Sequence, residues 1–218
     1  MTTDATELLE AQGLECVRGE RTLFSGLRLA LRSGELLRIA GPNGSGKTSL
    51  LRILCGLLSP TEGSVHWRGE NIRYLREDYW REMIYIGHAS AVKDDLSAEE
   101  NLVIACSLQG TRVSPEAARD ALRALGLTGC EHLPARVLSQ GQRRRVVLAR
   151  LLLSEATPLW ILDEPFTALD TLAVEQMQQT LSRHLARGAM LIYTTHQDAR
   201  IEAAVSRVID LGAGGRES

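Results

Sequence analysis

The sequence predicts an α/β fold in which a mainly parallel core sheet is joined by an antiparallel β subdomain and a helical subdomain. Short β-rich runs alternate with helical patterns, which favours a parallel sheet covered on both faces. A glycine-rich loop links one of these runs to a helix, and helix signals dominate from about residue 90 to 155. We expect residues 1–218 to form a single domain, with its helical subdomain at about 90–155.

The first third of the chain contains the antiparallel strands and the start of the core. Residues 14–17 and 27–31 are β-rich and half polar, as in antiparallel strands with one exposed face. A short strand is expected at 35–40, followed by the glycine-rich loop and a helix at 49–57. Further strands are expected at 63–69 and 83–87.

Capping signals place the helices of the middle third, and strands return after it. Ser97 with Glu100 forms a capping box, and Ser114 before Pro115 begins a helix that ends near Gly126. Strands are also expected at 159–162, 190–194 and 205–211, and a helix is expected at 171–186.

The composition excludes several classes of protein. With 44% hydrophobic and 24% charged positions, the chain is not intrinsically disordered. Its net charge of −2 lacks the basic excess of proteins that hold nucleic acid electrostatically, so no nucleic-acid partner is expected. Apolar runs fall short of the ~20 residues that cross a bilayer, and we expect no secretory signal. Membrane association is therefore expected through partners only, and the four cysteines are expected to be reduced and structural.

The glycine-rich loop, GPNGSGKT, matches the phosphate-binding pattern GxxxxGK[ST]. One chance match in this chain has a probability of about 0.002. Glycines let successive N–H groups face phosphate oxygens, and the helix dipole adds attraction. Lys47 should reach the β- and γ-phosphates and Thr48 should bind Mg²⁺, whereas the alternative is a turn with a solvated lysine. The residues expected to hold the nucleotide are Gly41, Pro42, Asn43, Gly44, Ser45, Gly46, Lys47, Thr48 and Ser49.

A second candidate element is LWILDE at 159–164, an apolar run that ends in two carboxylates. Such a strand places its acids at the carboxyl edge of the sheet, where open α/β folds bind ligands. Asp163 is expected to be a Mg²⁺ ligand, and Glu164 the catalytic base that polarises the attacking water. The alternative is that the acids only cap the following turn.

The third element is LSQGQ at 138–142, before a helical run. Ser139 and the Gly141 amide are expected at a helix N-terminus that faces an anion. Together with the two elements above, this segment resembles the LSGGQ signature of ATP-binding-cassette (ABC) ATPases, with Gln140 in place of a glycine. The resemblance covers about residues 8–211 and implies the P-loop NTPase fold of that family, with ATP and Mg²⁺ as ligands.

The resemblance also implies a homodimer, because in ABC ATPases the signature meets the γ-phosphate of ATP held by a second protomer. It places Ser139, Gly141 and Gln142 at that shared site, and Asp170 in a loop that crosses the interface. His196 occupies the position of the switch histidine that contacts the γ-phosphate and joins the expected catalytic residues.

Two positions depart from the family pattern. His88 stands where a glutamine that helps to hold Mg²⁺ is expected, and a neutral imidazole can orient water but prefers softer metals. Arg18 stands where an aromatic usually stacks on adenine, a role that a guanidinium plane can also serve. Residues 143–145, three arginines, are expected to form a solvated helix face rather than a nucleic-acid patch.

A closer resemblance is to the ATP-binding subunits of the cytochrome c maturation system. The features are TLFSGL at 22–27, Trp67, the IGH at 86–88 and LWILDEPFTALD at 159–170. The resemblance implies work at the cytoplasmic face of a bacterial inner membrane, with integral-membrane partner subunits. ATP hydrolysis would there serve haem handling and release of a haem-loaded chaperone.

Two alternatives stay open at this stage. The ATPase of another small exporter, for a drug, a lipid or a polysaccharide, shares the same catalytic motifs. A non-transport ABC protein that acts on ribosomes or DNA usually carries two cassettes or long coiled-coil insertions.

Overall fold

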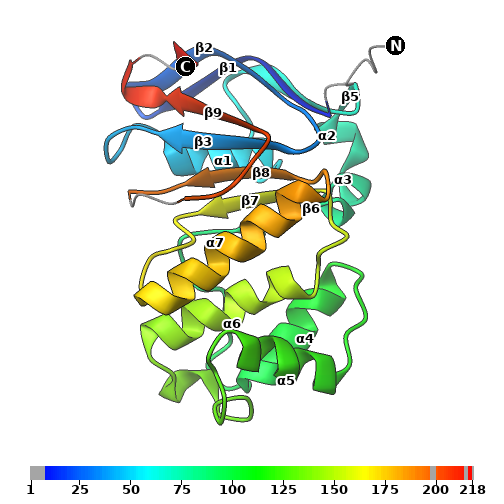
Figure 1. Cartoon of the computed structure of the whole chain (residues 1–218). Coiled ribbons are helices and arrows are strands. Elements are labelled where there is room, and N and C mark those ends of the chain that lie inside the picture. Colours follow the sequence, from blue (N-terminus) through cyan, green and yellow to red (C-terminus); the bar gives the residue numbers. More distant parts are fainter. Residues whose placement is uncertain (1–7, 197–199, 214–215, 218) are drawn as a thin grey trace.

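The computed structural model describes residues 8–196, 200–213 and 216–217, which form two sheets and a group of helices (Figure 1). The smaller sheet is antiparallel in the order β2-β1-β4-β5. Its strands are β1 (Leu9–Arg18), β2 (Arg21–Leu31), β4 (Glu62–Trp67) and β5 (Glu70–Asn71). The antiparallel β subdomain predicted from the sequence is therefore confirmed.

The larger sheet has the order β10-β9-β3-β8-β7-β6 and is parallel except for β10. Its strands are β3 (Glu35–Ala40), β6 (Met83–Ile86), β7 (Leu159–Asp163), β8 (Met190–Thr194), β9 (Val205–Asp210) and β10 (Arg216–Glu217). The carboxyl ends of β3, β7 and β8 lie side by side at one edge, and the candidate motifs follow from that edge. The predicted mainly parallel core is confirmed.

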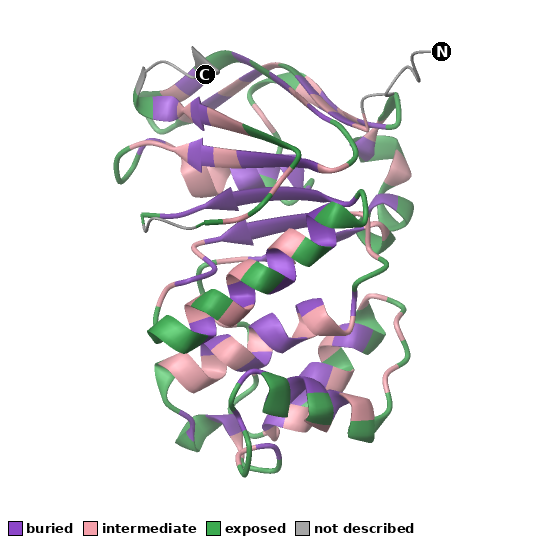
Figure 2. Ribbon diagram, in the orientation of Figure 1, coloured by how far each residue is buried: buried purple, intermediate pink, exposed green. Residues whose placement is uncertain are grey.

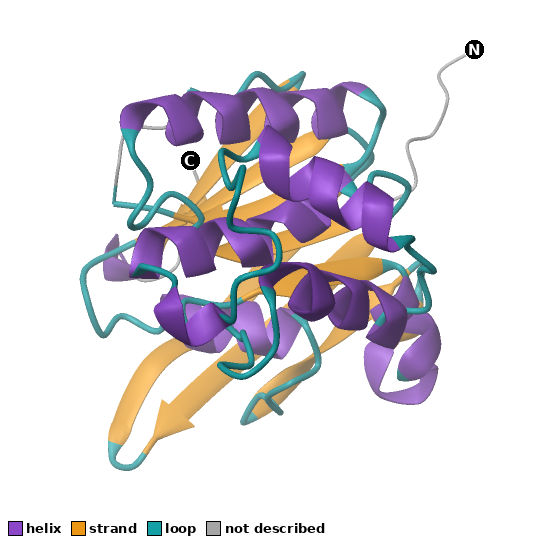
Figure 3. Cartoon of the chain, turned by 90° about the horizontal axis from the view of Figure 1, so that it is seen from below, coloured by secondary structure: helices purple, strands orange, loops and turns teal. Residues whose placement is uncertain are grey.

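Two hydrophobic clusters cover the two faces of the core sheet. Ile161 and Ile192 join the cluster that includes α1 (Lys47–Leu54) and the antiparallel sheet. Their neighbours Leu162 and Tyr193 join the cluster formed with the remaining long helices. Those helices are α4 (Ala98–Leu108), α5 (Pro115–Ala124), α6 (Gln140–Leu152) and α7 (Thr171–Ala186). Because side chains alternate along a strand, β7 and β8 are buried on both sides, as Figure 2 shows. Figure 3 shows the helices lying across the strands.

The helix starts follow the predicted caps. Ser97 accepts from the Glu100 N–H, and the Glu100 carboxylate accepts from the Ser97 N–H, which completes the capping box of α4. Ser114 caps α5 with Pro115 at its first turn. The described residues include no helix that is long and apolar enough to cross a membrane.

The sequence analysis did not predict two short helices, α2 (Ile72–Leu75) and α3 (Glu77–Arg81). They have too few residues to show a helical period, although Asn71 caps α2 by accepting from the Arg73 N–H. The first core helix also ends earlier than predicted. It stops at Leu54 because Gly56 adopts a left-handed backbone with φ of 70°.

Candidate active site

The phosphate loop connects β3 to α1 and faces a cavity of about 520 Å³. Gly46 caps α1 with φ of 101°, a conformation that glycine tolerates and other residues rarely adopt. The Lys47 Nζ donates to the carbonyl oxygens of Gly41 at 2.7 Å and Pro42 at 3.2 Å, so the loop fixes its own cation at the cavity wall. The lining residues are Leu23, Asn43, Gly44, Gly46, Lys47, Thr48, Ser49, His88, Asp163, Glu164, Thr167 and His196.

A network of hydroxyl and carboxylate oxygens closes one side of this cavity. The Thr48 hydroxyl donates to Asp163 Oδ2 at 2.8 Å, and the Thr194 hydroxyl donates to Asp163 Oδ1 at 2.7 Å. Asp163 and Thr194 are both buried. Oxygen ligands of this kind are those that Mg²⁺ prefers, so Thr48 and Asp163 fit a magnesium ion that also binds nucleotide phosphates.

Glu164 has an unusual backbone and a free carboxylate oxygen. Its φ of 51° is left-handed, which costs a non-glycine residue about 1–3 kcal/mol. Its N–H donates to Thr194 Oγ1 at 2.9 Å. The His196 N–H donates to Glu164 Oε2 at 3.3 Å, while Oε1 is buried and has no hydrogen-bond partner. A carboxylate oxygen at a cavity wall that accepts no hydrogen bond suits a base that accepts a proton from water.

His196 lies beside this carboxylate. Its Nε2 is 3.5 Å from Glu164 Oε1, and its side chain is about half exposed. His88 lines the same cavity from the loop after β6. It is far from the phosphate loop in the sequence, but both line this cavity. The structure thus brings together Lys47, Thr48, Asp163, Glu164 and the two histidines from four separate segments.

Arg18 does not reach this cavity. It lies exposed at the end of β1, opposite Arg21 in the β1–β2 hairpin. Arg21 comes nearer, since its Nη1 lies 3.8 Å from the point where a side chain on Gly44 would begin. Sequence reasoning missed Arg21 and Leu23, for which only their place after the hairpin turn gives a signal.

The signature segment forms the N-terminus of α6, outside the cavity lining. Ser139 caps the helix by accepting from the Gln142 N–H, and the Gln142 side chain accepts from the Ser139 N–H. A side chain on Gly141 would start 2.6 Å from the Ala168 carbonyl oxygen, so only glycine fits there. The signature therefore packs tightly against the loop that leads to Asp170.

Asp170 caps α7 by accepting from the Ala173 N–H at 2.9 Å, and it also pairs with Arg145. The hydrogen bond from Ala173 is the main reason that the pKa of Asp170 lies below its usual value, and Arg145 adds to the effect. The carboxylate consequently stays ionised and holds α6 to α7.

The expectation that residues 143–145 form a solvated face is wrong for Arg144, which is 3% exposed. Its Nη1 donates to the Gly87 carbonyl at 2.7 Å, and its Nη2 donates to the carbonyls of Asp163 and Glu164, both at 2.8 Å. Burial lowers the pKa of Arg144, against the attraction of the two neighbouring carboxylates. A signal existed in the sequence: positions 144, 148 and 151 share one helix face, and the other two are leucines in the core.

The other two arginines of this run are also paired. Arg143 forms an ion pair of 2.8 Å with Asp94, and Arg145 pairs with Asp170. The run therefore contacts three different elements and leaves no basic patch for nucleic acid among its members.

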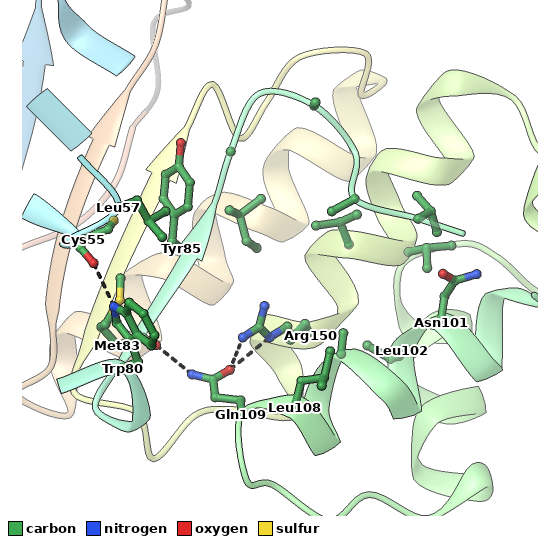
Figure 4. Close-up of a pocket in the computed structure, with 18 residues that line it drawn as sticks. Cys55, Leu57, Trp80, Met83, Tyr85, Asn101, Leu102, Leu108, Gln109 and Arg150 are labelled. Carbon is green, nitrogen blue, oxygen red and sulfur yellow. Dashed lines mark hydrogen bonds between the residues drawn. The ribbon is translucent and has the colours of Figure 1, made fainter. Parts of the chain in front are cut away.

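A second cavity, of about 400 Å³, lies between the core sheet and the helices (Figure 4). Its rim exposes Leu57, Trp80 and Leu108. Inside, Gln109 donates to the Met83 carbonyl at 2.7 Å and accepts from Arg150 Nε at 3.0 Å. We call this apolar cavity the lateral groove. An apolar hollow with a few fixed polar groups is typical of a protein-binding surface.

Comparison with known proteins shows which family shares these sequence features. The family model described as ABC transporter matches residues 24–167. The cytochrome c biogenesis ATP-binding export protein CcmA of Nitrosomonas europaea is 56% identical over 91% of this chain and 93% of the relative. The chain belongs to the ABC transporter family. A CcmA from Pseudomonas aeruginosa is 45% identical over 94% of this chain and 100% of its own length.

Solved structures of ABC proteins share the fold. A dimeric bacterial ABC transporter cassette is 27% identical, with a TM-score of 0.82 over 97% of this chain and 98% of its own. An ATP-binding cassette solved as a post-hydrolysis dimer bound to ADP and Pi is 25% identical, with a TM-score of 0.82 and the same coverage. The ABC ATPase fold predicted from the sequence is confirmed.

Proposed function

We propose that this chain is the ATP-hydrolysing subunit of an ABC complex in cytochrome c maturation, coupled to haem handling and to release of a haem-loaded chaperone. The observation that carries the proposal is the 56% identity to a cytochrome c biogenesis ATP-binding export protein over 91% of the chain. The intact phosphate loop and acidic strand end support the ATPase activity. By family resemblance, the complex acts at the cytoplasmic face of a bacterial inner membrane.

In this proposal, ATP binds along the phosphate loop with its β- and γ-phosphates at Lys47. Thr48 and Asp163 would hold Mg²⁺, and a bound Mg²⁺ would supply positive charge beside the phosphates. Glu164 accepts a proton from the attacking water through its free Oε1. His196 and His88 face the same cavity and orient the γ-phosphate and the water.

The signature supports a homodimer. Ser139, Gly141 and Gln142 stand at a helix N-terminus outside this chain's own cavity lining, where the helix dipole suits a phosphate held by a second copy. A fold neighbour was solved as a dimer with ADP and Pi. We infer that residues 1–218 work as one ATPase domain, with 90–155 as its helical subdomain and Asp170 near the dimer interface.

The lateral groove supports docking of an integral-membrane subunit. Exposed Leu57, Trp80 and Leu108 beside the polar Gln109–Arg150 pair suit one apolar face of a helix. Membrane association would then depend on the partner, in keeping with the described helices, none of which is long and apolar enough to cross a bilayer.

Deletion of the gene in its own bacterium tests the proposal. We expect loss of haem-loaded c-type cytochromes, measured by haem staining and absorbance, and rescue by the wild-type chain but not by Glu164→Gln. As a matched control, Glu155→Gln alters an exposed acid that pairs with Arg187 and should rescue fully. Intact c-type cytochromes after deletion would favour the ATPase of another exporter, for a drug, a lipid or a polysaccharide.

Purification from a detergent extract separates the remaining candidates. Integral-membrane subunits that co-purify with the tagged chain would support the proposed complex. Ribosomes in their place would contradict it and indicate a non-transport ABC ATPase.

A further inference from the structure

Arg144 is a buried cation whose bonded acceptors are neutral. All three are backbone carbonyl oxygens, and its Nε has no hydrogen-bond partner. Burying a guanidinium without a bonded carboxylate is unfavourable for stability. Because neutral carbonyls compensate a buried charge less fully than a carboxylate does, the position of this side chain beside the candidate active site points to a functional role.

Two of the acceptors mark the point at which neighbouring strands separate. Strands β6 and β7 are paired in parallel up to Ile86 and Leu162. Gly87 and Asp163 are the next residues, and Arg144 donates to both of their carbonyl oxygens. The planar guanidinium spans the gap with two nitrogens, which a single ammonium group cannot do. Arg144 therefore fixes the distance between the ends of the two strands.

The third acceptor belongs to Glu164. The left-handed backbone of this residue is held on both sides: Thr194 accepts from its N–H, and Arg144 donates to its carbonyl oxygen. Between these two hydrogen bonds, the side chain lines the cavity, and its Oε1 accepts no hydrogen bond. Removal of one of them allows the peptide to relax toward a more common conformation and carries the carboxylate away.

We propose that Arg144 is the positioning residue that holds Glu164 in its left-handed conformation and ties it to Gly87 at the wall of the lateral groove. Because Gly87 lines that groove, a helix seated there pulls on the catalytic carboxylate through two hydrogen bonds of one side chain. The inference rests on the proposed function, in which Glu164 is the base for ATP hydrolysis.

The test measures kcat and KM for ATP and the melting temperature of the purified full-length chain. In Arg144→Lys the charge remains but the two-pronged geometry is lost, so we expect kcat to fall about 100-fold with KM unchanged. Arg144→Gln should behave alike. The matched control is Arg207→Lys, which alters another partly buried arginine that donates to a strand carbonyl, away from the site, and should keep the wild-type kcat.

A double variant shows whether the effect passes through Glu164. If Arg144 acts by placing that carboxylate, Arg144→Lys in a Glu164→Gln background should hydrolyse ATP no more slowly than Glu164→Gln alone. Losses that multiply would overturn the inference, as would a wild-type kcat in Arg144→Lys. Full activity of Glu164→Gln would instead contradict the proposed function, so the two failures are distinct.

A stability measurement covers the case in which the Arg144 variants fold poorly. Glycine adopts a positive φ without strain, so Glu164→Gly should make the chain less sensitive to loss of Arg144. We expect Arg144→Lys to lower the melting temperature less in the Glu164→Gly background than in the Glu164→Ala background. An equal or larger decrease would overturn the inference.

Discussion

The phosphate-loop cavity and the signature segment differ in how completely the chain builds them. At the cavity, residues from four segments converge, and Asp163 alone accepts from two threonine hydroxyls. At the signature, one helix N-terminus carries Ser139 and Gly141, neither of which lines the phosphate-loop cavity. The first region offers a complete set of phosphate and Mg²⁺ contacts within one chain, whereas under the proposed function the second completes the site of another chain. In the proposed dimer, catalysis would need both chains, although each chain would bind its own nucleotide.

The largest expected effect concerns the cavity alone. Glu164→Gln keeps the shape of the side chain but removes its basicity, so kcat should fall about 1,000-fold. ATP affinity should remain, because the phosphate loop is unchanged. Measurement of hydrolysis by phosphate release and of binding by calorimetry checks both points. Near-normal hydrolysis would place the base elsewhere.

The next effect separates nucleotide binding from hydrolysis. Lys47→Ala removes a charged donor to the phosphates and should weaken ATP binding about 100-fold, since a hydrogen bond to a charged group contributes up to about 3 kcal/mol. Lys93, the other lysine of the chain, is exposed in a loop and offers the control Lys93→Ala. Equal affinities of the two variants would contradict the assignment of Lys47.

The signature is tested by a smaller loss with a distinctive rescue. Gly141→Ala places a methyl group against the Ala168 carbonyl and should slow hydrolysis about 30-fold, because small displacements of catalytic groups are costly. ATP affinity should stay unchanged. Mixed with Lys47→Ala, it should recover activity, because one of the two sites in the mixed dimer is then intact. No recovery on mixing would show that the signature serves its own chain.

The smallest effect concerns the strand and helix behind the cavity. His184 of α7 stacks on Trp160 of β7 at 3.5 Å between ring centroids, and burial, helped by Arg187, lowers the pKa of His184 to about 4. The unfolded chain binds a proton near pH 6.5, so stability is full above that pH and is lost as the pH falls toward 4. At pH 5.5 the loss is about 1.4 kcal/mol, a tenfold change in the unfolding constant.

Urea unfolding of the wild type and of His184→Gln at pH 7.5 and pH 5.5 measures this difference. The variant should lose less free energy of unfolding between the two pH values than the wild type. Equal losses would show that folding does not lower the pKa of His184.

Much of this architecture could be predicted from the sequence because its signals are local. The caps at Ser97 and Ser114 and the phosphate loop each depend on residues within a few positions of one another. The burial of Arg144 was not predicted, because a run of three arginines suggests a solvent-exposed segment. Only the leucines four and seven positions later indicate that Arg144 lies on the buried face of the helix. The contacts of Thr194 and the stacking of His184 depend on strand order, which no local pattern encodes.

The position of Arg144 on the signature helix has a consequence for how two sites communicate. In the proposed dimer, the N-terminus of α6 contacts the ATP that the partner chain holds. Arg144, five residues after Ser139, donates to the carbonyl oxygen of Glu164 in its own chain. In that dimer, a movement of α6 at one nucleotide would also move Glu164 at the other nucleotide. The second chain would act on the first in the same way. Linkage of this kind is reciprocal, so each ATP site should change the affinity of the other by the same factor, which a Hill coefficient different from one would reveal.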